Sequence, residues 1–315
     1  MWLIASGLVI LSCILVIETM PPRPNVYWAA ATAESVDMDG ERLDRLEQTL
    51  RERQSTAILI ARSGHLVREW YASNGGPNHR YSLAAAAKGI VGSMLVLASF
   101  DDEYVTLDDL ASDYIPDWKK KPMRSRITLR QLASHQSGME DLWGGDYQRL
   151  RGDRFRMALE EASIDFEPGT RQRYSGTAFY PLSLALSEAL QETPHPDLRD
   201  FLDARIMDPL EIPPEAWNIS YSESYQQGGL TLYAIGSGAS YTARAVARVS
   251  QLILDQGRWN GRKLLSHESL EALVTVGPDP PERIGEEPEP PANLGWWLNI
   301  ERFSPSLPCD SIVAL

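Results

Sequence analysis

Lys88 has the residue type and the setting that acid–base chemistry requires. It follows the alanine run at positions 84–87 and begins a stretch that stays apolar for two turns. A lysine at the start of a buried helix needs a partner or a cavity. Residues three apart share a helix face, so a serine at position 85 would place its hydroxyl beside the amine and be activated for acyl transfer. That position holds Ala85, so the segment predicts a base without its nucleophile. The alternative is an ordinary lysine on a solvated face.

Tyr174 is the second candidate, in the turn of residues 167–176 ahead of a predicted helix. A tyrosine hydroxyl held near a lysine can relay a proton, because the cation favours the phenolate. The alternative is a tyrosine that only tethers a loop. Ser82 is a poor substitute nucleophile, because it precedes the alanine run and would lie about 240° around a helix from Lys88.

His135 is expected to be structural. It lies at the end of a predicted helix that Thr128 caps, among Ser134, Gln136 and Ser137, which commonly hydrogen-bond loops. Gly138 then ends the segment. A base role for His135 is the alternative, but no spacing pairs it with a serine as a triad.

Composition narrows the function classes. The chain has 315 residues, of which 43% are hydrophobic, enough to form a large core. Its net charge of −13 argues against binding of nucleic acid or an anionic membrane through a basic face. Five His residues lack metal-ligand spacing, so no metal and no cofactor are expected. With only Cys13 and Cys309, a disulfide framework is not expected.

The remaining pattern predicts helices in the middle of the chain and strands at both ends. A helix is expected over 39–54, with Leu43, Leu46 and Leu50 on one face. The other predicted helices span 84–99, 107–111 capped by Thr106, 129–134, 178–190 and 242–254. The predicted strands span 56–62 and 66–71 around a Ser63-Gly64 turn, then 293–299 and 311–315.

Residues 2–17 are almost wholly apolar, which favours a secretory signal or a membrane anchor. We therefore expect an exported chain, either periplasmic or extracellular, or membrane-anchored. Residues 1–36 are expected to be leader and linker, with Pro and Ala over 21–36, and residues 37–315 to form one domain. Because the final predicted strand would leave an unpaired apolar edge, a truncation after Leu315 is expected.

Together these segments resemble the serine β-lactamase-related family, which includes class C β-lactamases, D-alanyl-D-alanine peptidases (penicillin-binding proteins) and esterases. Each motif is weak alone, and their order carries the resemblance. The similar segments are the hairpin 58–71, the Ser-x-x-Lys-like segment 81–88, the Leu-x-x-His-x-Ser-Gly segment 127–138, the approach 168–174 to a Tyr-x-Asn motif, the Gly-rich turn and helix 236–251, and the strand Gly295-Trp296-Trp297.

The resemblance implies an α+β fold, in which helices flank an antiparallel sheet and an all-helical domain is inserted. It implies that Lys88 accepts the nucleophile's proton, that Tyr174 serves the acid–base relay and that Ala85 stands at the nucleophile's position. Gly176 stands where the family has Asn, and the family's third motif would follow Leu315. The implied substrates are small amides or esters, including peptidoglycan-like ones.

Ala85 is explained by a natural loss of the nucleophile or by an engineered Ser→Ala exchange, and Gly176 favours the natural loss. Three readings stay open. The chain is a serine hydrolase by descent with little or no activity, a pseudoenzyme that binds ligands in the old cleft, or an envelope-anchored structural protein.

Overall fold

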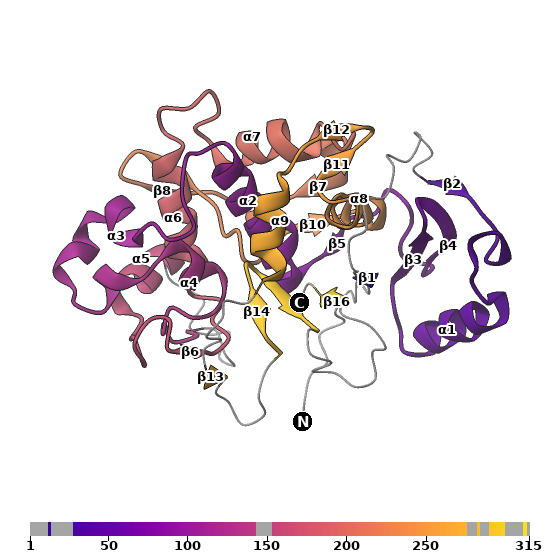
Figure 1. Cartoon of the computed structure of the whole chain (residues 1–315), viewed down its shortest axis with the longest axis horizontal. Coiled ribbons are helices and arrows are strands. Elements are labelled where there is room, and N and C mark those ends of the chain that lie inside the picture. The colour runs from indigo at the N-terminus through magenta and orange to yellow at the C-terminus, as the bar shows by residue number, and fades with distance from the viewer. Residues whose placement is uncertain are drawn as a thin grey trace.

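The computed structural model describes residues 12–13, 28–142, 153–275, 282–283, 290–299 and 311–313. Figure 1 shows a helix-rich half, a central group of helices and a small sheet with one helix at the opposite end. The fold is the expected α+β arrangement of helices with small sheets. The leader prediction over residues 2–17 lies outside the described residues, apart from Ser12–Cys13.

One apolar helical segment forms the centre of the core. It starts as a 3-10 turn, η2 (Ala84–Ala86), continues as a π-helix, η3 (Lys88–Ser93), and ends as α2 (Met94–Asp101). The segment is apolar all round and packs into the core, as such helices do. Among the described residues it is the one helical segment long and apolar enough to cross a membrane, and it is mostly buried inside the protein. The predicted helix over 84–99 is confirmed, but its first half is not α-helical.

The helix-rich half follows in the chain and surrounds α6 (Figure 1). Its helices are α3 (Ala111–Tyr114), η4 (Pro116–Lys120), η5 (Arg124–Arg126), α4 (Leu129–Ala133), α5 (Arg154–Arg156), η7 (Met157–Glu161) and α6 (Phe179–Ala189). Helices α7 (Leu198–Leu202) and η8 (Asp203–Met207) come next in the chain and pack against α2. Toward the C-terminus, α8 (Ala243–Leu254) and α9 (His267–Val274) pack against the central segment. The predicted helices over 129–134, 178–190 and 242–254 are confirmed, with the predicted cap at Thr128 and a further one at Thr242.

The strands form several small sheets instead of one sheet. In the first, β2 (Ala29–Ala30) runs parallel to β4 (His65–Tyr71), which pairs antiparallel with β3 (Ala57–Arg62). In the second, β14 (Ala292–Asn293), β15 (Trp296–Leu298), β16 (Ser311–Val313) and β1 (Ser12–Cys13) are neighbours in that order. The remaining pairings are short: β5 (Tyr81–Ser82), β10 (Ser240–Tyr241) and β7 (Trp217–Asn218); β8 (Tyr225–Gln227) and β9 (Leu230–Leu232); β11 (Arg258–Trp259) and β12 (Arg262–Lys263); β6 (Arg171–Gln172) and β13 (Glu282–Arg283).

Two predictions about the ends of the chain need correction. The strand expected over 293–299 is a hairpin, because Leu294 and Gly295 both have positive φ and turn the chain between β14 and β15. The strand expected at the chain end is not an open edge, since β16 pairs with β15 on one side and β1 on the other. The described part of the expected linker, residues 28–36, forms β2 and η1 (Glu34–Val36).

One helix prediction needs correction as well. No helix forms over 107–111: the Thr106 backbone N–H and Oγ1 both donate to the Asp109 carboxylate at 2.9 and 2.6 Å and close a turn, and α3 begins only at Ala111. Helix α1 (Gly40–Glu52) forms as expected, capped by Asp39. Of its apolar face only Leu43 is buried, whereas Leu46 is 44% exposed.

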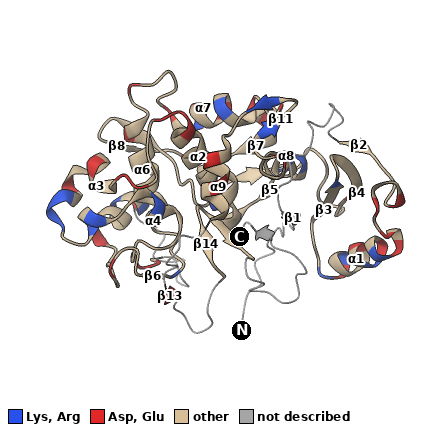
Figure 2. Cartoon of the chain, viewed as in Figure 1, with Lys and Arg blue, Asp and Glu red and all other residues tan. Residues whose placement is uncertain are grey.

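Charged side chains are interspersed over the surface. Figure 2 shows Lys and Arg beside Asp and Glu along α1 and around α3. Arg45 pairs with Glu41 along α1, and Lys119 pairs with Asp113 near α3. These pairs are exposed, so each contributes little stability.

Candidate active site

The structure brings the two candidate catalytic side chains, Lys88 and Tyr174, into contact. The Lys88 ammonium donates to the Tyr174 hydroxyl at 2.7 Å and to the Gly236 carbonyl oxygen at 3.1 Å. It lies 4.8 Å from the centre of the Tyr174 ring and 5.5 Å from that of Phe179. Lys88 is only 4% exposed, so the interpretation as a solvated surface lysine is wrong.

Burial changes the acidity of Lys88. Desolvation lowers its pKa from 10.5 to about 8, and the negative charge of Asp141 opposes that fall. An amine with this pKa is partly neutral near neutral pH and can accept a proton there, as a general base must. The expected pairing of a perturbed lysine with a tyrosine hydroxyl is therefore present in the geometry.

Tyr174 is half-buried and lies between β6 and the start of α6. Hydrogen bonds fix the chain immediately after it. The Ser175 N–H donates to His135 Nδ1 at 3.2 Å and its hydroxyl donates to the Glu140 carbonyl oxygen at 3.2 Å. The Gly176 N–H donates to Asp141 Oδ1 at 3.1 Å. These contacts join the loop that follows α4 to the segment that carries the tyrosine.

His135 forms part of the wall around this pair. Its ring centre lies 4.8 Å from that of Tyr174, 5.7 Å from that of Trp297 and 5.8 Å from that of Phe179. Burial, together with the charge of Lys88, lowers the pKa of His135 to about 3, so the ring is neutral at physiological pH. Since Nδ1 accepts from Ser175, the proton of the neutral ring is assigned to Nε2. A neutral, stacked imidazole fits the structural role expected from the sequence.

Ala85 lies one turn before Lys88 in the 3-10 segment η2 and is partly exposed. Residues i and i+3 align in a 3-10 turn. Although this turn replaces the expected α-helix, Ala85 and Lys88 therefore remain on the same side of the segment. Ala84 has a φ of 44°, which is uncommon for a residue with a side chain and marks the sharp entry into the helix. Ser82 lies outside the helical segment, in β5, where it pairs with Ser240 of β10.

The β14–β15 hairpin closes the site from the other side. Gly295, at its turn, has a φ of +86°, and a Cβ placed there would lie 2.4 Å from the Lys88 carbonyl oxygen. Its N–H donates to the Ala133 carbonyl oxygen at 2.8 Å. Only glycine permits this approach, so the predicted late strand contacts the lysine's own backbone.

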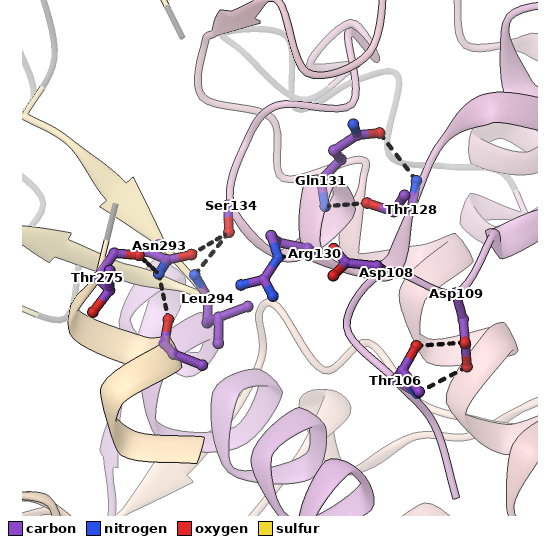
Figure 3. Close-up of polar contacts among 11 residues, drawn as sticks. Thr106, Asp108, Asp109, Thr128, Arg130, Gln131, Ser134, Thr275, Asn293 and Leu294 are labelled. Carbon is purple, nitrogen blue, oxygen red and sulfur yellow. Dashed lines mark hydrogen bonds and ion pairs between the residues drawn. The ribbon is translucent and has the colours of Figure 1, made fainter. Parts of the chain in front are cut away.

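A buried polar network, drawn in Figure 3, anchors the same hairpin. The Ser134 hydroxyl donates to Asn293 Oδ1 at 2.8 Å and accepts from the Leu294 N–H at 3.0 Å. Asn293 Nδ2 donates to the carbonyl oxygens of Ala272, Leu273 and Thr275 at 2.6, 3.2 and 3.0 Å. The network thereby satisfies carbonyls at the end of α9, which a helix end would otherwise leave unpaired.

Sequence reasoning missed three groups of this site: Asp141, Asn293 and the carbonyl of Gly236. The polar residue followed by glycine at 293–295, inside an apolar run, was a turn signal that could have indicated the hairpin. Asp141 shows no motif, and its place depends on how the loop folds back after Gly138. Every residue has a backbone carbonyl, so the sequence does not indicate that the one at Gly236 accepts from Lys88.

Comparison with known proteins gives one family match. A family model described as Beta-lactamase matches residues 43–307. No curated protein matches the chain.

Solved structures share its fold. They include a candidate β-lactamase from Bacteroides dorei, with TM-score 0.60 and 20% identity, covering 76% of this chain and 73% of that one. They also include a candidate 6-aminohexanoate-dimer hydrolase from Bacillus anthracis, with TM-score 0.64 and 18% identity, covering 97% and 84%. A D-stereospecific amidohydrolase from Streptomyces sp. has TM-score 0.56 and 20% identity, covering 74% and 75%.

At these identities the structural likeness shows the fold alone, and the family model covers most of the chain. The matched range takes in Ala85, Lys88, His135, Tyr174 and the β14–β15 hairpin. The chain belongs to the Beta-lactamase family.

Proposed function

We propose that this chain is a serine-hydrolase homologue that keeps the base and the proton relay of acyl transfer but lacks the nucleophile. It would bind small amides or esters, with little or no turnover. The observation that supports the proposal is the 2.7 Å contact between the buried Lys88 amine and the Tyr174 hydroxyl, with a lysine pKa near 8. A lysine kept in this state inside a core is costly unless its amine is used or its contacts are needed.

The ancestral reaction follows from these groups. A serine at position 85 would lose its hydroxyl proton to the Lys88 and Tyr174 pair while its oxygen attacks the substrate carbonyl carbon. The departing amine or alcohol would take up that proton, leaving an acyl ester on the serine. Water would then hydrolyse the ester and regenerate the hydroxyl. Ala85 has no hydroxyl, so this route is closed, and only binding and electrostatic effects remain.

The substrate class rests on the fold. The structures from Bacillus anthracis and Streptomyces sp. carry names of enzymes that act on amides. We extend this class to the chain as a proposal, with peptidoglycan-like peptides as one member and simple esters as the most reactive one. The neutral His135, Tyr174 and Trp297 would give the site an aromatic wall suited to apolar parts of such a ligand.

The test compares the chain with its Ala85→Ser variant on p-nitrophenyl acetate and on a panel of D-amino-acid amides. The proposal expects ester hydrolysis only in the variant, abolished again by Lys88→Met in the same variant. Calorimetry on the unchanged chain tests ligand binding without turnover. Absence of both hydrolysis and binding would leave only a structural role and would contradict the proposal.

We further propose that the chain is exported or membrane-anchored, because residues 2–17 form an almost wholly apolar run. Fractionation of cells that express the full chain tests this. Recovery in the cytoplasmic fraction would contradict it.

A further inference from the structure

Gly176 leaves the site without a side chain at the second position after Tyr174, yet a polar group reaches that spot from elsewhere. Asp141 belongs to the loop after α4, and its Oδ1 accepts the Gly176 N–H at 3.1 Å. Asp141 is half-buried. A carboxylate from a different segment thus stands beside the turn that carries the tyrosine.

Two neighbouring contacts hold the Asp141 loop in register with that turn. The Ser175 hydroxyl donates to the Glu140 carbonyl oxygen, and the Leu142 N–H donates to Thr177 Oγ1 at 2.9 Å. Residues 140–142 therefore bind residues 175–177 one after another. The carboxylate cannot leave this place without breaking a local pairing of the two segments.

The Asp141 carboxylate has two electrostatic effects. It lies at the N-terminal end of α6, whose cap residue Ala178 has no side-chain acceptor, and negative charge is favourable there. Its negative charge also acts on a buried ammonium, because it raises the pKa of Lys88 against the effect of desolvation. The other titratable groups at Lys88 among the described residues are Tyr174 and His135, and His135 is neutral.

We propose that Asp141 is a positioning residue of this site, which fixes the Tyr174 turn through the Gly176 N–H and supplies the negative charge that balances the buried Lys88 ammonium. This role deepens the proposed acyl-transfer site and rests on it for its use in catalysis. The carboxylate does the work of an amide side chain at position 176, from another part of the chain.

Two substitutions separate geometry from charge. Asp141→Asn keeps an acceptor for the Gly176 N–H and removes the charge, whereas Asp141→Ala removes both. Asp108→Asn makes the same change at a distant exposed carboxylate that pairs with Arg130, and serves as the control.

The first readout uses the chain as it stands, because it has only five lysines: Lys88, Lys119, Lys120, Lys121 and Lys263. Carbon-13 labelled lysine allows the Lys88 side chain to be titrated by NMR, with Lys88→Met to assign its signal. We expect Asp141→Asn to move the Lys88 midpoint to lower pH and Asp108→Asn to leave it in place. A purely structural cap on α6 would not move it. An unchanged midpoint in Asp141→Asn would overturn the proposal.

The second readout is the pH profile of ester hydrolysis in the Ala85→Ser background. Asp141→Asn should shift the acid limb to lower pH with kcat retained within a few fold, and Asp141→Ala should lower kcat roughly tenfold or more through misplacement of the tyrosine. Equal kcat in Asp141→Ala and the parent would overturn the positioning role. If the parent shows no hydrolysis, the proposed function fails, and the NMR titration still decides the role of Asp141.

Discussion

Replacing Lys88 by Met tests whether a charged lysine in the core destabilises the folded protein. The amine is 4% exposed and its pKa falls from 10.5 to about 8. Since one pKa unit corresponds to about 1.4 kcal/mol, keeping this lysine charged in the folded protein costs about 3 kcal/mol. Met has a similar unbranched shape and no charge, so Lys88→Met removes that cost.

The substitution also removes two hydrogen bonds, to the Tyr174 hydroxyl and the Gly236 carbonyl oxygen. Each contributes about 1 kcal/mol. At pH 7 we therefore expect Lys88→Met to raise the free energy of unfolding by about 1 kcal/mol. A stabilising substitution at a functional position is the usual mark of a site that sacrifices stability for chemistry.

The pH dependence gives the sharper test. The folded-state pKa lies below the unfolded one, so between pH 8 and 10.5 the unfolded chain binds more protons at Lys88 than the folded chain. Stability of the unchanged protein therefore rises with pH across this window, whereas Lys88→Met lacks that gain. Between pH 7 and pH 10.5 the difference in the free energy of unfolding between the two proteins should therefore change by about 3 kcal/mol. It should also reverse sign, so that Lys88→Met is the less stable protein at pH 10.5, because the neutral amine no longer carries the charge cost and the variant still lacks the two hydrogen bonds.

Urea unfolding of both proteins at pH 7 and at pH 10.5 measures this difference, and other titrating groups cancel in the comparison. Lys263→Met, which removes an exposed lysine of β12, is the control. If the difference in the free energy of unfolding between Lys88→Met and the unchanged chain stays constant over pH, the folded protein does not hold Lys88 as a destabilised ammonium.

Two further predictions concern the hairpin that closes the site. Gly295→Ala should lower the free energy of unfolding by about 2 kcal/mol or more, because its Cβ would meet the Lys88 backbone at a φ of +86°. The control is Gly261→Ala, at a φ of +78° with no atom near the added Cβ, which should cost only about 1 kcal/mol. Equal losses of the two variants in thermal unfolding would show that the contact with Lys88 does not limit the residue at position 295. Asn293→Ala should cost about 2 to 3 kcal/mol because it leaves carbonyls at the end of α9 without a donor. A double-mutant cycle with Ser134→Ala should show coupling of about 1 kcal/mol, and strict additivity would show that the network of Figure 3 does not act as a unit.

Much of the fold was predictable because its signals are local. Thr128 caps α4 with a full capping box, and the Ser63-Gly64 turn joins β3 to β4, both readable from a few adjacent residues. The Thr106 cap failed for a local reason as well. Asp109 competes for the threonine's hydroxyl and N–H, so a closed turn replaces the helix.

The site was predictable only in part. Lys88 and Tyr174 are separated by 86 positions, and their meeting was expected from the ordered resemblance of several motifs, not from either residue. Asp141 and Gly236 enter the site through a loop contact and a backbone carbonyl, which depend on tertiary folding. The π-helical turn at Lys88 was also unexpected, because apolar periodicity does not distinguish it from an α-helix.

Covalent labelling with a fluorophosphonate probe tests most directly whether the chain keeps the base but lacks the nucleophile. We predict that the unchanged chain is not labelled and that Ala85→Ser is labelled at position 85, with labelling lost in Ala85→Ser combined with Lys88→Met. Mass spectrometry of the labelled peptide identifies the residue. Labelling of the unchanged chain at another serine, such as Ser82, would contradict this prediction.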